Sequence, residues 1–267
     1  MSLKRNLSRF VYENGSTRRV LQEWHAFPGR KWVRKTGAFA SKSWSEHGED
    51  TLLLKIGEGL EVLKDGFYVD VGANLPTRRS NTFALYCQGM RGLCLEPNLE
   101  LAALFEKARD EDDVVCAAVG DTFSVASFWR FNFHVFSTCS ESVAQGRLEG
   151  TNQMQSSLQR SSLVPMIPLR ELLKEYFVRR KDEAFFLLKA DTEGFDLEVL
   201  RSNDWSQYRP ICVLTESTGQ TNEISLFLQE KGYRLAHSFP VNQLFVEERS
   251  YSKCVELGLL SAEGGVE

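Results

Sequence analysis

Apolar positions in the chain alternate between the spacing of helices and that of strands. In residues 49–63 the leucines and Ile56 recur on one helical face. The run GFYVDVGAN at residues 66–74 is β-branched and aromatic and ends at a glycine, which indicates a buried strand and its exit turn. Further strands are predicted at 92–98 and 113–121, and further helices at 80–89 and 101–108. Strand-then-helix units in succession predict a parallel sheet with helices on both faces.

The second half of the chain resumes this pattern after an irregular middle. Residues 124–133 alternate enough for a strand or a hairpin arm, whereas 137–162, rich in Ser, Gln and Gly, predict a mobile loop of the kind that forms lids or binding loops. Beyond it, the predicted helices are 168–178, 195–200 and 221–231, and the predicted strands are 185–194, 211–217, 233–238 and 242–247. The fold class is therefore α/β.

Composition narrows the class of protein. With 42% hydrophobic and 25% charged residues among 267, the chain has the make-up of a globular protein. No apolar run reaches the roughly 18 residues of a membrane span, and the N-terminus lacks the apolar core of a secretory signal. The six cysteines form no CxxC pair and several fall in strand-like runs, so we expect reduced thiols in a cytoplasmic protein.

Charge separates the N-terminus from the rest. Residues 1–42 carry ten Lys and Arg against two Glu, whereas the remainder of the chain is acidic. Such a basic segment could touch nucleic acid or an anionic membrane, but we favour a solvated, partly helical arm that packs on the acidic body. The acidic body argues against nucleic acid as the main substrate. Whether the arm makes a homo-oligomer is open.

Carboxylates stand at or near the end of each of the first five strands predicted for the sheet. They are Asp70, Glu96, Asp121, the pair Asp191 and Glu193, and Glu216. Ligands of open α/β sheets bind outside the carboxyl ends of the strands. The predicted crevice is therefore acidic, which suits a ligand with hydroxyls and a positive charge better than a polyphosphate.

The turn after the first strand separates two classes of cofactor. A dinucleotide site needs G-x-G-x-x-G, but the turn DVGANLP holds one glycine. S-adenosylmethionine has no phosphate and needs one close backbone approach (Gly72), an acid near its amino group (Asp70) and an acid for its ribose. Glu96, 24 residues beyond Gly72, is at about the spacing of a ribose-binding acid.

Over residues 43–247 the chain resembles the FkbM-type methyltransferase family. The motifs that carry the resemblance are SWSEHGEDTLL, FYVDVGANLPTRRSNTFALYCQGMRGLCLEPN, CAAVGD, LLKADTEGFDLEVLRSNDW and the late GYRL. The resemblance implies the seven-stranded, mostly parallel class I methyltransferase (Rossmann-like) sheet, with S-adenosylmethionine as donor and hydroxyls of sugars or polyketides as acceptors. One departure is Ala190, where the family commonly has Ile before the acidic motif.

The resemblance also implies roles for individual residues. Cofactor contacts are implied for Asp70, Gly72 and Asn74 of the glycine turn, for Glu96 at the ribose, for Asp121 near the adenine, and for Ser45, Glu49 and Asp50 of a short motif over the methionine end. Asp191 and Glu193 match the acidic motif after the fourth strand. The implied domains are the arm at 1–42, a methyltransferase domain at 43–250 and a C-terminal tail at 251–267.

A hydroxyl acceptor must lose a proton, so a base must reach it. Asp191 and Glu193 are the first candidates, and His134 and His47 are alternatives, because histidine as a residue type suits proton transfer near neutral pH. Asp191, Glu193 and Glu216 could offer oxygens to Mg²⁺, but the resemblance requires no metal and no His/Cys cluster supports one, so none is predicted.

We therefore predict O-methylation of a sugar, glycan or small metabolite. Two other classes stay open. One is a catalytically silent module that binds S-adenosylmethionine, and the other is an NAD(P)-dependent oxidoreductase in which Arg78 and Arg79 read a 2′-phosphate.

Overall fold

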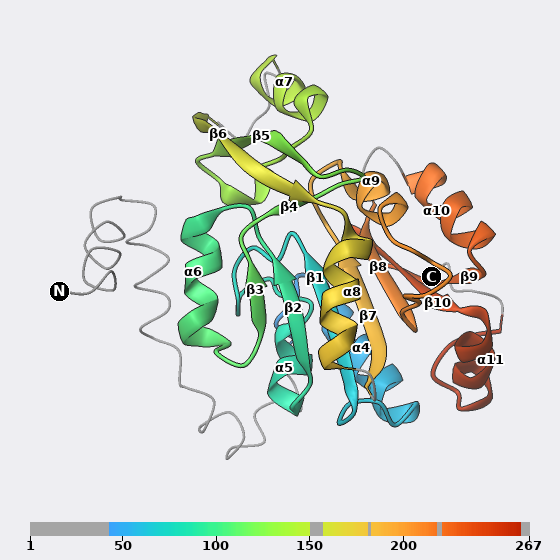
Figure 1. Cartoon of the computed structure of the whole chain (residues 1–267). Coiled ribbons are helices and arrows are strands. Elements are labelled where there is room, and N and C mark those ends of the chain that lie inside the picture. Colours follow the sequence, from blue (N-terminus) through green and yellow to red (C-terminus); the bar gives the residue numbers. More distant parts are fainter. Residues whose placement is uncertain (1–42, 150–156, 181–182, 218–220, 263–267) are drawn as a thin grey trace. The chain divides into compact units, whose positions relative to one another are not determined.

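The computed structural model describes residues 43–149, 157–180, 183–217 and 221–262 (Figure 1). The arm predicted at 1–42 lies outside the described residues. None of the helices in the described ranges is long and apolar enough to cross a membrane. All six cysteines are free thiols, as predicted.

A seven-stranded sheet forms the centre of the domain, with the order β3-β2-β1-β7-β8-β10-β9. Its strands are β1 (Gly66–Val71), β2 (Arg91–Leu95), β3 (Asp113–Val115), β7 (Ala184–Ala190), β8 (Cys212–Glu216), β9 (Tyr233–Ser238) and β10 (Asn242–Glu247). β10 runs antiparallel to both of its neighbours, and the pairs formed by β1, β2, β3, β7 and β8 are parallel. The predicted seven-stranded, mostly parallel sheet is confirmed.

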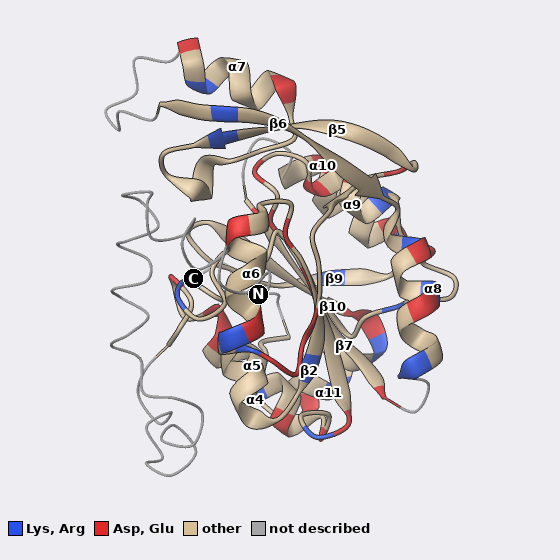
Figure 2. Ribbon diagram, turned by 60° about the vertical axis from the view of Figure 1, so that its left-hand side comes forward, with Lys and Arg blue, Asp and Glu red and all other residues tan. Residues whose placement is uncertain are grey.

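Helices cover both faces of this sheet. They are α4 (Glu49–Gly59), α5 (Phe83–Gln88), α6 (Leu99–Ala108), α8 (Leu169–Arg179), α9 (Asp196–Arg201), α10 (Thr221–Glu230) and α11 (Glu248–Glu256). Figure 2 shows α4, α5 and α6 on one side of the strands and α8 and α9 on the other. The strands β1 and β7 are buried almost throughout, because a parallel sheet between two helical layers has no solvated face.

A smaller second sheet stands beyond the carboxyl ends of the parallel strands (Figures 1 and 2). It has the order β4-β6-β5, with β4 (Ala118–Val119), β5 (Ser124–Phe131) and β6 (Leu158–Ile167), and is accompanied by the 3₁₀ turn η2 (His134–Phe136) and α7 (Glu141–Glu149). Phe128, Val164 and Met166 form its apolar centre, against which Phe195 packs.

Two expectations differ from this arrangement. The single strand predicted at 113–121 is two strands, β3 in the large sheet and β4 in the small one. The loop predicted at 137–162 contains α7 and the first part of β6; residues 150–156 are not described. The strand there forms by pairing of β6 with β5, and the helix buries Ala144 alone, so neither element has an apolar period of its own.

The C-terminal boundary predicted at residue 250 falls inside α11. Tyr251 and Cys254 of this helix are buried, and the helix packs on β9 and β10. The packed domain therefore continues to at least Glu256, so the C-terminal tail begins after this residue and not at residue 251.

Candidate active site

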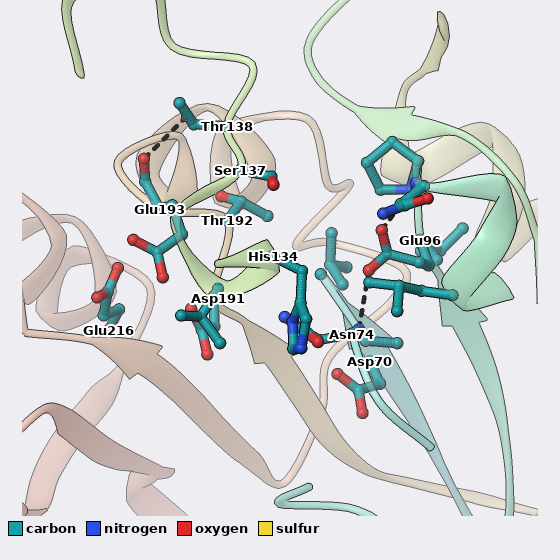
Figure 3. Close-up of a pocket in the computed structure, with 18 of the residues that line it drawn as sticks. Asp70, Asn74, Glu96, His134, Ser137, Thr138, Asp191, Thr192, Glu193 and Glu216 are labelled. Carbon is teal, nitrogen blue, oxygen red and sulfur yellow. Dashed lines mark hydrogen bonds between the residues drawn. The ribbon is translucent and has the colours of Figure 1, made fainter. Parts of the chain in front are cut away.

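A cavity of about 550 Å³ lies at the carboxyl ends of β1, β2, β7 and β8. Its walls come from the turns that follow these strands and from the small sheet with η2. Figure 3 shows acidic side chains along it, with Glu96 near one end and Glu193 and Glu216 near the other. The edge at which the sequence predicts a ligand is therefore the edge that carries the cavity.

The turn after β1 requires its glycine. Gly72 has a φ of +73°, and a Cβ there would lie 2.0 Å from the backbone oxygen of Asp191. The amides of Gly72 and Ala73 donate to the carbonyl of Leu95 at 2.9 and 3.1 Å. Asn74 follows in the left-handed region too, with a φ of 53°. The turns after β1 and β7 thus touch through backbone, and no larger residue fits between them.

Glu96 closes one end of the cavity from the end of β2. Its carboxylate accepts hydrogen bonds from the backbone amides of Asn74 and Asn98, both at 2.8 Å (Figure 3). Only 5% of the residue is exposed, and burial raises the pKa of Glu96 to about 7 although these two amides oppose the shift. Each oxygen accepts from one backbone amide and keeps capacity for a further donor, so the carboxylate can accept two ligand hydroxyls.

A buried lysine joins the two acidic turns. The Nζ of Lys189 donates to the carbonyl of Gly72 at 2.8 Å and lies 3.3 Å from Asp70 Oδ1 and 3.4 Å from Asp191 Oδ2. Burial alone would lower the pKa of Lys189, but the charges of Asp191 and Asp70 outweigh it and raise the pKa. The ammonium therefore stays charged and fixes both carboxylates. The sequence analysis missed Lys189, although a lysine inside the most apolar strand is a visible signal.

Asp70 is also held from behind. The hydroxyl of Thr82 donates to Asp70 Oδ2 at 2.6 Å, and Arg109 donates to that hydroxyl at 3.0 Å. Arg109 is fully buried and pairs with Asp112 at 2.7 Å. Asp70 is thus anchored on the side away from the cavity, and its orientation is set before any ligand arrives.

Three carboxylates gather at the opposite end. Asp191, Glu193 and Glu216 offer oxygens that lie within 4.8 Å of one another. Burial, followed by the negative charges of Glu216 and Asp191, raises the pKa of Glu193 to about 8. Arg147 of α7 opposes this shift by donating to Glu193 Oε2. Because this arginine already supplies a positive charge, we assign no metal ligands here.

His134 enters the cavity from η2 (Figure 3). Its Nδ1 is buried and has no hydrogen-bond partner in the described part of the chain. Burial, and then the charges of Arg79 and Arg78, lower the pKa of His134. The imidazole is therefore neutral near pH 7 and can accept a proton.

The family model described as methyltransferase FkbM domain matches residues 70–235, which is more than half of the chain. The chain belongs to the FkbM methyltransferase family. No curated protein matches. A solved structure described as a candidate RNA methyltransferase from Pyrococcus horikoshii aligns over 78% of this chain and 92% of that chain, with a TM-score of 0.38 and 9% identity. A similarity of this size carries no argument, whereas the family match confirms the resemblance drawn from the motifs.

In this FkbM methyltransferase the acid expected near the adenine lies elsewhere. The side chain of Asp121 is 69% exposed, pairs with Arg170 at 3.2 Å and does not line the cavity. The reason is the split of the predicted strand: the chain leaves the large sheet after Val115, so residue 121 is carried past the cavity. Ala118 and Val119 line the cavity in its place.

In the short motif before the sheet, the residues with implied cofactor contacts stand behind the FkbM cavity, whereas Glu46 of the same motif lines it. Ser45 donates to Asp50 at 2.9 Å, and Glu49 accepts from the side-chain amide of Asn242 at 2.6 Å. Asn242 lines the cavity, whereas Ser45 and Glu49 do not. Glu49 thus reaches the cavity only through Asn242, and the cofactor contact implied for Ser45 has no geometric support.

Proposed function

We propose that this FkbM methyltransferase transfers a methyl group from S-adenosylmethionine to a hydroxyl of a sugar, a glycan or a small metabolite. The observation that carries the proposal is the distribution of polar groups along one cavity. Glu96 and the glycine turn lie toward one end and Glu193 toward the other, with Asp191 and His134 between them. A donor and an acceptor of a methyl group need such adjoining sites.

The residues present fit S-adenosylmethionine. Gly72 lines the cavity while its backbone packs against that of Asp191, and Glu96 offers a carboxylate for a ribose diol. The Oδ1 of Asn74 is buried without a hydrogen-bond partner in the described residues and can accept from a ligand. When bound, S-adenosylmethionine supplies an electrophilic methyl group on a positively charged sulfur. The acidic walls favour that charge over the pyrophosphate of a dinucleotide.

The acceptor side has to orient a hydroxyl and remove its proton. The ammonium of Lys189 lies 3.4 Å from the Asp191 carboxylate and fixes it, which suits Asp191 to orient the hydroxyl. Glu193, with a pKa of about 8, has a proton affinity matched to neutral pH and is the first candidate for the base. His134 is the second, because its imidazole is neutral and its Nδ1 is open to a donor.

The size and charge of the cavity favour a compact acceptor. A volume of about 550 Å³ lies within the range of small-molecule sites. Asp191, Glu193 and Glu216 would repel a phosphodiester backbone at the place where the base stands. Uncharged, hydroxyl-rich molecules meet no such repulsion and can donate hydrogen bonds to the same carboxylates.

Two measurements test the proposal. In thermal denaturation, S-adenosylhomocysteine should stabilise the protein, while NAD and NADP should not; stabilisation by NADP alone would contradict the choice of cofactor. Labelled S-adenosylmethionine is then offered with a panel of nucleotide sugars, glycans and hydroxylated metabolites, with an RNA as comparison. Label on a hydroxyl oxygen supports the proposal. Cofactor binding without transfer to any acceptor would favour a silent binding module.

A further inference from the structure

Helix α7 lies outside the large sheet, and described contacts join it to the turn that carries Glu193. Val143 stands so close to Gly194 that a Cβ added to Gly194 would lie 2.7 Å from Cγ2 of Val143. Ala144 is the one residue of α7 that is fully buried. Ahead of the helix, the hydroxyl of Thr138 donates to the backbone oxygen of Glu193 at 3.0 Å. The segment from Thr138 to Arg147 therefore holds this turn.

Arg147 provides the charged contact of this segment. It donates through Nη2 to the carboxylate of Glu193 and through Nη1 to the carbonyl of Phe136, and its guanidinium lies 5.3 Å from the centre of the Phe136 ring. About a fifth of each side chain of the Arg147–Glu193 pair is exposed, so water screens it only in part.

The backbone adds to the constraint on Glu193. Glu193 has a φ of 58° and Gly194 one of 91°, so two consecutive residues lie in the left-handed region. A non-glycine residue holds such a conformation only where its surroundings fix it. Here Thr138 holds the backbone oxygen of Glu193 and Arg147 holds its carboxylate.

From these contacts we infer that Arg147 is a positioning residue for methyl transfer, which orients the Glu193 carboxylate and stabilises the ionised form that accepts a proton. The inference rests on the proposed function of Glu193 as base. The other charged groups on this side of Glu193 are Asp191 from its own turn and Glu216 from β8, which both repel a second negative charge. Lys189 is engaged with Asp191, and His134 faces the cavity from η2. Among the residues that the structure describes, Arg147 is thus the cation that contacts Glu193 directly.

The direction of the effect follows from charge. Removing Arg147 takes a positive charge from Glu193 and leaves Asp191 and Glu216 in place, so a proton binds Glu193 more tightly. A neighbouring arginine lowers the pKa of a carboxyl by roughly 1 to 3 units, and partial exposure places the expected effect at the low end. We therefore expect the titration of Glu193 to move upward by about one pH unit.

Carbon-13 NMR of the full chain labelled at the glutamate carboxyls measures this titration directly, with Glu193→Gln to assign the signal. Arg147→Gln should move the midpoint upward by about one unit, and Arg147→Lys should retain most of the wild-type value. Arg130→Gln is the matched control, since Arg130 pairs with Glu100 at 2.8 Å with similar exposure and neither residue lines the cavity. The inference is overturned if the midpoint in Arg147→Gln is equal to or lower than that of wild type, and if Arg147→Lys has the same midpoint as Arg147→Gln.

Methyl transfer provides the second readout and separates the inference from the function on which it rests. In Arg147→Gln the acidic limb of the pH profile of kcat should shift upward by the same amount, while the KM for S-adenosylmethionine is unchanged. An upward shift of the NMR midpoint in a protein that methylates nothing contradicts the proposed function and leaves the contact with Glu193 standing. Transfer with an unshifted profile contradicts the role of Arg147 and leaves the function standing.

Discussion

Replacing Glu96 by alanine tests the cofactor site most directly. In the proposed complex each carboxylate oxygen accepts one ribose hydroxyl in addition to the amide it already holds. Hydrogen bonds to a charged group contribute roughly 1.5–3 kcal/mol each, and water fills part of the gap when they are lost. The loss of two should weaken the binding of S-adenosylhomocysteine by at least about tenfold, since about 1.4 kcal/mol corresponds to a factor of ten.

The pKa of Glu96 adds a dependence on pH with a definite sign. A carboxyl with a pKa of about 7 carries a proton below that pH, and the protonated form must lose it before both oxygens can accept ribose hydroxyls. The dissociation constant should therefore be flat above pH 7 and rise by about tenfold per unit below it, until the pKa of the complex is reached. Without a titratable group at this position, Glu96→Ala should lack this slope.

Glutamine at this position is not a neutral replacement. The carboxylate faces two donors, the amides of Asn74 and Asn98, so a side-chain NH₂ must point at one of them or turn away. We expect Glu96→Gln to bind more weakly than wild type at pH 8 and to show no slope below pH 7. In Glu96→Ala the same two amides lose their acceptor, so we expect this variant to be somewhat less stable than wild type.

Calorimetric titration of S-adenosylhomocysteine between pH 5.5 and 8.5 measures both effects, with circular dichroism to verify the fold. Glu100→Gln is the control, because Glu100 lies four residues on, pairs with Arg130 and does not line the cavity. Equal affinity of wild type and Glu96→Ala at pH 8 would refute the ribose assignment. A slope that persists in Glu96→Gln would show that another group titrates.

Three further changes have expected outcomes. Gly72→Ala places a Cβ 2.0 Å from the backbone oxygen of Asp191, so calorimetry should detect no binding of S-adenosylhomocysteine and urea denaturation should show lower stability. Of the variants Asp191→Asn and Glu193→Gln, the one that removes the base should lower kcat by roughly 10² to 10⁴, with little change in cofactor affinity. Near-normal rates in both variants would favour another base. Between pH 9 and 6.5 the folded protein binds protons at Glu193 and Asp196, whose pKa values burial raises to about 8, whereas the unfolded chain binds almost none there. Stability to urea should thus increase as the pH falls, by about 2 kcal/mol per group, and Glu193→Gln should flatten the profile.

The large sheet could be predicted because its signals are local. Strands β9 and β10 have the bounds that alternation and Pro240 indicate, and the buried runs at β1 and β7 are too apolar for any other place. Parallel order then follows from the succession of strands and helices. Short-range patterns fix these elements before any distant contact is considered.

The small sheet could not be predicted in this way. Its strand β6 begins with exposed residues that are polar after Leu158, and it forms through pairing with β5, more than 25 residues earlier in the chain. Helix α7 buries Ala144 alone and has no apolar stripe, so its sequence resembles that of a loop. Both elements depend on tertiary contacts, which the periodicity of apolar residues does not reveal.

The acids of the site could be predicted from the strand ends, but the cations beside them could not. Asp70, Glu96 and Asp191 line the cavity as the parallel order requires. Asp121 does not line it, because its strand leaves the sheet early. The chemistry of these acids depends on which cation each meets. Lys189 holds Asp70 and Asp191, and its partner Asp70 is 119 residues away in the chain.

Which acids titrate near neutral pH therefore follows from the tertiary structure. Burial raises the pKa of Glu96 to about 7 although two backbone amides oppose the shift. Burial and two neighbouring carboxylates raise the pKa of Glu193 to about 8 although Arg147 opposes the shift. Asp191, which follows the same strand as Glu193, is instead fixed by Lys189. In the proposed function, two acids two residues apart would thus have different roles, Asp191 in orientation and Glu193 in proton transfer, because their cations come from different parts of the fold.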